Sequence, residues 1–126
     1  MIHWLEKHRV ASAILAILIT IEIFYFSTLQ GGTGTGGIPF VSTAYHFIVF
    51  FLFSFFLLMA IKGKNKLKTK QILIVLAISI AHAILDEVHQ SFVPFRDAGI
   101  RDVITDSLGI FSAMIVAKIA NRKSNQ

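Results

Sequence analysis

Four apolar stretches dominate the sequence, and short polar segments separate them. The stretches cover residues 10–29, 45–61, 72–90 and 103–120. A helix needs about 20 mostly apolar residues to cross the hydrocarbon core of a bilayer. The first, second and fourth stretches are long enough as they stand, whereas the third has only 14 residues before Asp86, so its last turn is polar. The pattern predicts an all-α integral membrane protein, with four transmembrane helices in a compact bundle that forms a single domain over residues 1–126.

The first stretch follows Lys7 and Arg9, as the apolar core of a secretory signal peptide would. Its apolar run, however, is longer than the roughly 7–15 residues of such a core. It also contains Glu22, and a glycine-rich segment follows it instead of a small-residue cleavage site. We therefore interpret residues 10–29 as a retained helix.

The composition supports this class of protein and excludes several kinds of chemistry. Hydrophobic residues make up 55% of the 126 residues, charged residues make up only 15%, and the mean hydropathy is +0.71. A soluble domain of this size needs more polar surface to cover its core. The sequence has no cysteine, which excludes disulfides, thiol nucleophiles and cysteine-ligated metal sites.

The basic residues are distributed unevenly along the chain. Ten of the twelve lysines and arginines lie before the first stretch, between the second and third, or at the end of the fourth. Because positive charge is retained in the cytoplasm, this distribution predicts that both termini are cytoplasmic. Segments 30–44 and 86–102 then face outward. The lysines between Lys62 and Lys70 are interpreted as a topology signal beside anionic lipid, and no nucleic-acid partner is expected.

The segment Gly31–Gly37 superficially resembles a phosphate-binding loop. It has no lysine at the required place and follows no strand, so a nucleotide site is not predicted. We interpret the segment as an uncharged external hairpin.

Acidic residues gather in the second half of the chain. Five of the seven fall within 21 positions: Asp86, Glu87, Asp97, Asp102 and Asp106. A sixth, Glu22, lies in the outer half of the first helix. An ionisable residue inside a span is costly and is expected to face the bundle interior with a partner. Glu22 therefore either bonds Tyr25 or a neighbouring helix, or belongs to a polar site shared with the other helices.

The third helix has the densest set of polar side chains. At 100° per residue, His82, Asp86, His89 and Gln90 fall within roughly 100° of arc, and Glu87 flanks them. Two imidazoles and a carboxylate on one face are possible metal ligands. The spacing is not that of a known zinc motif, and a hydrogen-bonded network or a carboxylate–imidazole pair for proton transfer is favoured. We predict no metal and no cofactor.

The fourth helix has two different faces. One is polar or small, and the opposite one is bulky and apolar, with Ile104, Leu108, Phe111 and Ile115. The polar and small residues are Asp102, Asp106, Gly109, Ala113 and Ala117. Small residues spaced four apart permit close helix approach, so this face is predicted to point inward. The expected partner of Asp106 is Arg96, Arg101 or His82.

The connection between the third and fourth helices must turn sharply, and Pro94 and Gly99 favour a turn. It places Arg96 above the carboxylates. A guanidinium there suits an anion such as phosphate, and it equally suits an internal salt bridge.

In this region the sequence resembles the VanZ-like family of bacterial membrane proteins. The matching residues are Asp86-Glu87-x-x-Gln90, Pro94-x-Arg96, Asp102-Val103, Asp106 and Gly109, with Tyr45-His46-Phe47 and Ser27 earlier in the chain. The loop after Ser27 departs from the family because it is glycine-rich and lacks a proline near that serine. The resemblance implies a bacterial plasma-membrane protein and a link to resistance against the glycopeptide teicoplanin. The positions that it implies are Glu22, His46, Asp86, Glu87, Gln90, Arg96, Asp102 and Asp106.

Two main functions fit this cluster of polar residues. The first is an enzyme acting on a lipid-linked or envelope precursor, with Asp86 or Glu87 as general base, His46 or His82 as a proton shuttle and Arg96 as an anion clamp. The second is a non-catalytic membrane module that binds an envelope ligand or modulates envelope proteins. A purely structural polar core or a minimal transporter is a third hypothesis. Membrane lipid is the expected partner in each case.

Overall fold

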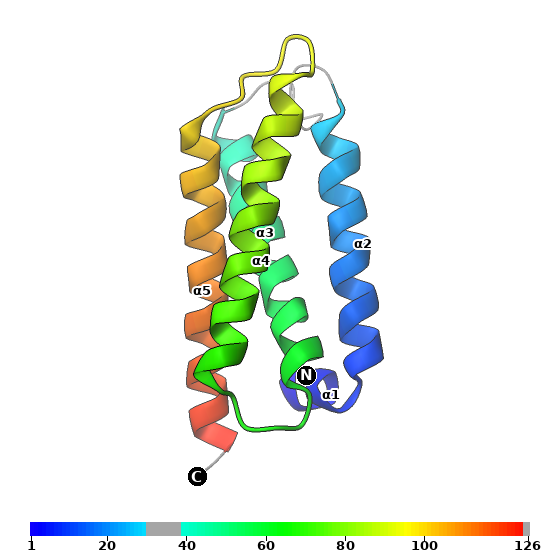
Figure 1. Ribbon diagram of the computed structural model, residues 1–126, viewed down its shortest axis with the longest axis vertical. Coiled ribbons are helices and arrows are strands. Elements are labelled where there is room, and N and C mark those ends of the chain that lie inside the picture. Colours follow the sequence, from blue (N-terminus) through cyan, green and yellow to red (C-terminus); the bar gives the residue numbers. More distant parts are fainter. Residues whose placement is uncertain (30–38, 125–126) are drawn as a thin grey trace.

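The computed structural model of the chain describes residues 1–29 and 39–124, and all regular structure in that part is helical (Figure 1). The helices are α1 (Ile2–Lys7), α2 (Arg9–Ser27), α3 (Pro39–Lys62), α4 (Thr69–Ser91) and α5 (Ile100–Ser124). The four long helices, α2 to α5, run side by side, and each is long and apolar enough to cross a membrane. The predicted all-α class and the four spans are confirmed.

The helices α3, α4 and α5 extend at both ends beyond the apolar stretches that predicted them, whereas α2 ends two residues before the end of its stretch. α3 begins at Pro39, six residues before the predicted start, and proline is well tolerated in the first turn of a helix. The start of α4 is fixed by Gln71, whose Oε1 accepts a hydrogen bond of 2.9 Å from the Lys68 N–H. The glycine-rich segment Gly31–Gly37, predicted to be a hairpin, lies outside the described residues.

α3 is the central helix of the bundle, because α2, α4 and α5 all pack on it. Its buried side chains contribute to two core clusters, one around Leu58 and Met59 and the other around Phe50 and Val49. The closest approach is at Gly109 of α5. A Cβ atom there would overlap the Phe47 carbonyl oxygen and would lie 3.1 Å from the Phe51 nitrogen.

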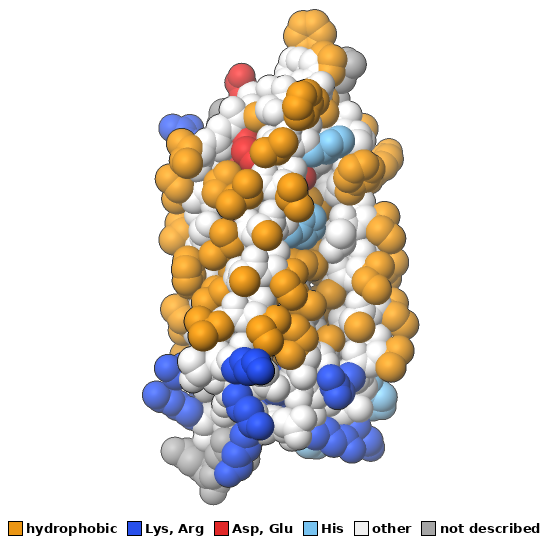
Figure 2. Space-filling view, in the orientation of Figure 1, with side chains coloured by type: hydrophobic (Ala, Val, Ile, Leu, Met, Phe, Trp, Pro, Cys, Tyr) orange, Lys and Arg blue, Asp and Glu red, His pale blue; other side chains and the backbone are white. Residues whose placement is uncertain are grey.

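The two faces predicted for the fourth helix are confirmed in α5. The small residues Ala113 and Ala117 are buried against the bundle. The bulky residues of the opposite face are exposed: Ile104, Leu108, Phe111 and Ile115. Large apolar side chains also cover the outer surfaces of α2 and α4 (Figure 2). In a bilayer, lipid tails solvate this surface at no hydrophobic cost.

The two ends of the bundle differ in charge. We call the end formed by α1, the last turn of α3, the start of α4 and the end of α5 the basic end, since lysines and arginines gather there (Figure 2). The opposite end is the polar end, where α2 and α4 finish and α3 and α5 begin. The acidic side chains from Asp86 to Asp106 all belong to the polar end.

The basic end is closed by contacts that involve the unpredicted helix α1. Glu6 of α1 forms a buried ion pair with Lys62 at the end of α3, with 2.6 Å between Oε1 and Nζ. Arg9, at the start of α2, donates from Nε to the Ala60 carbonyl oxygen at 2.8 Å. The carbonyl groups at the end of a helix lack intrahelical partners, so a cation that bonds them stabilises the helix terminus.

Gly63 follows α3 in the left-handed region, with φ of +56°, and a side chain there would overlap Arg9 Cδ. Gly63→Ala is expected to lower the free energy of unfolding by about 1–2 kcal/mol, because alanine is strained at this φ and displaces the Arg9 cap. Thermal unfolding of the detergent-solubilised protein measures the change. Gly99→Ala is the matched control, since no atom of the described residues, apart from its two neighbours in the chain, lies within 4 Å of its added Cβ. Equal losses in both variants would contradict the prediction.

Candidate functional site

Four helices contribute buried polar side chains to one region at the polar end. Ser27 comes from the last turn of α2, His46 from the second turn of α3, Asp86 and Gln90 from the end of α4, and Asp106 from α5. All are almost completely enclosed by the chain: Asp106 is 0% exposed, Gln90 1%, His46 and Ser27 2%, and Asp86 6%. Such groups are costly inside a membrane span unless they are paired, so the arrangement needs partners.

His46 and Asp106 form a pair across the interface between α3 and α5. The distance between His46 Nδ1 and Asp106 Oδ1 is 2.9 Å. The second imidazole nitrogen, Nε2, lies 3.9 Å from Asp102 Oδ2, which is too far for a hydrogen bond. His46 Nε2 and Asp106 Oδ2 are both buried without a hydrogen-bond partner among the described residues. The pair therefore has unused bonding capacity on both sides.

Asp86 is the centre of a second network. Its Oδ1 accepts a short hydrogen bond from the Ser27 hydroxyl, and its Oδ2 accepts one from Gln90 Nε2 at 2.7 Å. Gln90 in turn accepts at Oε1 from Arg96 Nε, at 3.1 Å. Arg96 also donates from Nη1 to the carbonyl oxygens of Phe26 and Leu29 at the end of α2. The network thus connects α4, the α4–α5 loop and the end of α2.

The two networks meet in the centre of the bundle. His46, Asp86 and Asp106 each offer one ligand atom, and these three atoms all lie within 4.8 Å of one another. An imidazole and two carboxylates at this separation can exchange protons or share one bound ion or molecule.

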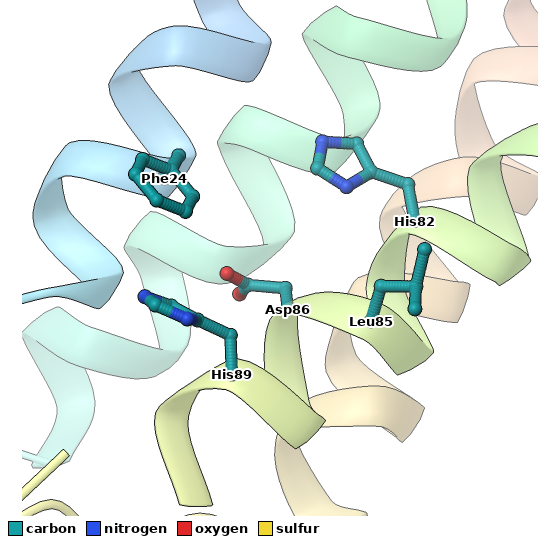
Figure 3. Close-up of a pocket in the computed structure, with 5 residues that line it drawn as sticks. All are labelled: Phe24, His82, Leu85, Asp86 and His89. Carbon is teal, nitrogen blue, oxygen red and sulfur yellow. The ribbon is translucent and has the colours of Figure 1, made fainter. Parts of the chain in front are cut away.

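A pocket of about 210 Å³ lies beside this cluster, between α2 and α4 (Figure 3). Phe24 of α2 lines one side, and His82, Leu85, Asp86 and His89 of α4 line the rest. The Asp86 carboxylate points toward α2, between His89 and His82 (Figure 3). Phe24 stacks on His89 with ring centroids 4.8 Å apart, and both Phe24 and Leu85 are exposed on the apolar surface. The pocket therefore opens onto the surface that lipid would cover.

A comparison with protein families matches residues 11–121 to the model of the VanZ/LLP1 family. The chain belongs to the VanZ/LLP1 family. The match covers α3 and α4 completely and all but the first two residues of α2 and the last three of α5, and it includes every residue of the buried cluster. No significant match is found among curated proteins or among solved structures. Family membership and four apolar helices together make this a multi-pass membrane protein.

Other residues predicted to form the site lie around the buried cluster of this VanZ/LLP1 protein. Glu87 is half-buried, and its Oε1 accepts a short hydrogen bond from the Gly99 N–H, which ties α4 to the loop before α5. Asp102 is half-buried beside His46. Glu22 lies on the exposed side of α2, beside the Tyr45 phenol of the neighbouring helix α3, and among the described residues it has no hydrogen bond to the buried cluster.

The partner predicted for Asp106 is wrong. None of the three predicted residues bonds it, and its partner is His46 of α3. Arg101 is exposed, and the His82 ring lies between Phe50 and Phe53, with centroid distances of 5.4 and 4.9 Å. Arg96 bonds an amide and two carbonyl groups, and the described residues include no ion pair between it and a carboxylate.

Ser27 was absent from the predicted site, although its hydroxyl bonds Asp86 directly. The sequence did carry one signal for Ser27, which is its match to the serine of the VanZ-like family. A serine at the end of an apolar helix identifies no partner by itself, because serine is tolerated in spans without a partner on another helix.

Proposed function

We propose that this protein binds the head group of a membrane lipid or lipid-linked envelope precursor at its polar end and performs acid–base chemistry on it. The observation that carries the proposal is the buried cluster of His46, Asp86 and Asp106, with unpartnered polar atoms, next to a pocket that faces lipid. In the proposed orientation the polar end faces outward, because ten of the twelve basic residues belong to the opposite end.

The His46–Asp106 pair supports proton transfer. A carboxylate that accepts from Nδ1–H fixes the tautomer of an imidazole and leaves Nε2 as the proton acceptor. The geometry at His46 fits this arrangement, since Nδ1 is 2.9 Å from Asp106 and Nε2 is unpartnered. Asp86 extends the acid–base cluster to the pocket wall, where a ligand group can reach it.

The pocket supports a ligand that stays partly in the membrane. Its exposed apolar members, Phe24 and Leu85, suit the first carbons of a lipid chain, while Asp86 and His89 suit a polar head group. Arg96 lies one hydrogen bond beyond Gln90. Its Nε and Nη1 groups donate to Gln90 and to two backbone carbonyl groups, so its Nη2 group is the one assigned to an anionic part of the ligand, through a charge-assisted hydrogen bond.

Turnover by purified protein in lipid nanodiscs tests the proposal. The probes are labelled phosphatidylglycerol, phosphatidylethanolamine and a polyprenyl-phosphate-linked sugar. His46→Gln and Asp86→Asn are each expected to lower turnover by about 10²–10⁴-fold, the usual contribution of general acid–base catalysis. Asp97→Asn is the matched control, because Asp97 is exposed in the α4–α5 loop and is expected to have wild-type activity.

Two results would overturn the enzymatic proposal. Binding at one ligand per chain with no product would replace it with the non-catalytic binding module. Equal activity in the wild type, His46→Gln and Asp86→Asn would move the chemistry away from this cluster. Circular dichroism of each variant separates loss of activity from loss of folding.

A further inference from the structure

The buried cluster holds two enclosed carboxyl groups, and its protein partners supply at most one positive charge. Asp86 and Asp106 are both enclosed, and Asp102 lies at the edge of the same space. The groups that donate to Asp86, Ser27 and Gln90, are neutral. The nearest guanidinium, Arg96, bonds Gln90 and backbone carbonyl oxygens. His46 alone can supply at most one positive charge. Two ionised carboxylates buried in a span need more positive charge beside them than one imidazolium supplies.

The donor atoms of the cluster also have unused bonding capacity that points to a ligand. His46 is 2% exposed and Asp106 is 0% exposed, yet His46 Nε2 and Asp106 Oδ2 have no partner among the described residues. Buried polar atoms are nearly always bonded to protein, water or an ion. A metal bound to Asp106 Oδ1 can also take the unpartnered Asp106 Oδ2, and the ligand atoms of His46 and Asp106 lie within 4.8 Å of that of Asp86. His46 Nε2 faces Asp102 Oδ2 at 3.9 Å and is not one of the atoms that this metal would bind.

We propose that His46, Asp86 and Asp106 bind one divalent transition-metal ion, of the Zn²⁺ or Mn²⁺ class. The three ligands come from α3, α4 and α5, so the metal would join three of the four spans. The distance of 2.9 Å between His46 Nδ1 and Asp106 Oδ1 is close to the roughly 3 Å that separates two ligands held at right angles by bonds of about 2.1 Å. The metal replaces the proton that these two atoms now share.

The donor set decides the class of metal. Imidazole is a good ligand for Zn²⁺ and other transition metals, and carboxylates suit Mn²⁺ as well. Ca²⁺ takes about six to eight oxygen ligands, more than this enclosed site offers, and Mg²⁺ seldom binds imidazole. Three protein ligands leave at least one coordination position for water or substrate, as in catalytic rather than structural metal sites.

The possible metal ligands that share one helix face in the sequence are a different set. His82, Asp86 and His89 share one helix face, but the His82 ring is packed between Phe50 and Phe53, and His89 stacks on Phe24. Only Asp86 belongs to both sets. The proposed ligands are 40 and 20 residues apart in the sequence, so no local motif identifies them.

The metal would serve the chemistry of the proposed function. Its binding, however, does not depend on that function being correct. If the metal binds, His46 would act as a ligand, and the metal would supply Lewis acidity at the site in place of the imidazole base. Without it, the His46–Asp106 pair acts alone. Metal content therefore tests the inference separately from turnover.

The test uses untagged, full-length protein stripped with EDTA and then equilibrated with micromolar Zn²⁺ or Mn²⁺ in detergent. We expect one bound metal per chain by elemental analysis, an altered Mn²⁺ electron paramagnetic resonance spectrum, and release of a proton on binding. Asp106→Asn and His46→Gln are expected to weaken binding by about 10-fold or more. Asp97→Asn, His3→Gln and His89→Gln are expected to bind like the wild type.

Wild-type protein that binds less than about one tenth of an equivalent under these conditions overturns the inference, whatever the variants do. Loss of the metal in His89→Gln, with retention in Asp106→Asn, would overturn it in favour of the α4 face. If turnover survives EDTA while the His46 and Asp86 variants are inactive, the proposed function stands and the metal does not. Loss of turnover in EDTA that Zn²⁺ or Mn²⁺ restores supports both.

Discussion

Gly109→Ala is expected to destabilise the bundle by about 3 kcal/mol, although alanine favours the helical state by about 1 kcal/mol over glycine. The added Cβ would overlap the Phe47 carbonyl oxygen, and the backbone of α3 cannot move aside as a flexible side chain could. α3 and α5 must therefore separate. Because Asp106 lies one turn before Gly109, the separation also lengthens the contact between His46 and Asp106.

Thermal or SDS-induced unfolding of the purified variant in detergent measures this loss. Leu108→Ala is the matched control, since Leu108 is the neighbouring residue and is exposed on the lipid-facing side of α5. It is expected to change the free energy of unfolding by less than about 0.5 kcal/mol. An unfolding midpoint for Gly109→Ala equal to that of the control would show that α3 and α5 do not pack this closely.

Glu6→Ala is expected to cost about 3–5 kcal/mol, because it leaves the Lys62 ammonium buried without its carboxylate. Lys62 is 3% exposed, and Nζ is 2.6 Å from Glu6 Oε1. The double variant Glu6→Leu with Lys62→Met removes both charges and keeps the volume. It is expected to recover most of the stability, as replacement of a buried ion pair by apolar groups commonly does.

A double-mutant cycle compares Glu6→Leu, Lys62→Met and the double variant by thermal unfolding, and it measures the coupling between Glu6 and Lys62. His3→Ala serves as the control, because its side chain is 92% exposed and lies 3.7 Å from the other Glu6 oxygen. Additive effects of the two single changes would mean that the ion pair does not form at the basic end.

The spans could be predicted from the sequence because their signal is local. A run of about 20 apolar residues has one low-energy conformation in a bilayer, since a helix forms all the hydrogen bonds of its backbone N–H and C=O groups within the segment. The inward face of α5 followed for the same reason, because Asp106, Ala113 and Ala117 recur at helical spacing. The sequence did not predict α1, because this helix has only six residues, Glu6 and Lys7 among them, and its apolar residues show no helical spacing. Its place depends on Lys62, far away in the sequence.

The polar side of each helix could be predicted from the sequence, but the pairing of its side chains with those of other helices could not. Helical spacing shows which side of a helix is polar, and so placed Asp86, Gln90 and Asp106 toward the interior. It does not show which neighbour that side meets. Asp106 was therefore assigned to residues close in sequence, whereas α5 packs on α3 and presents Asp106 to His46. The pairing depends on bundle topology, and Gly109 allows the close contact that brings it about.

The opening of the pocket between α2 and α4 determines which concentration of the ligand sets the occupancy of the site. Phe24 and Leu85 open it sideways onto the apolar surface, so the proposed membrane-embedded ligand would reach Asp86 by diffusing within one leaflet. Occupancy then depends on the mole fraction of that ligand among the surrounding lipids and not on its concentration in the aqueous phase. Dilution with inert lipid at constant total ligand is therefore expected to empty the site, whereas dilution with buffer is not.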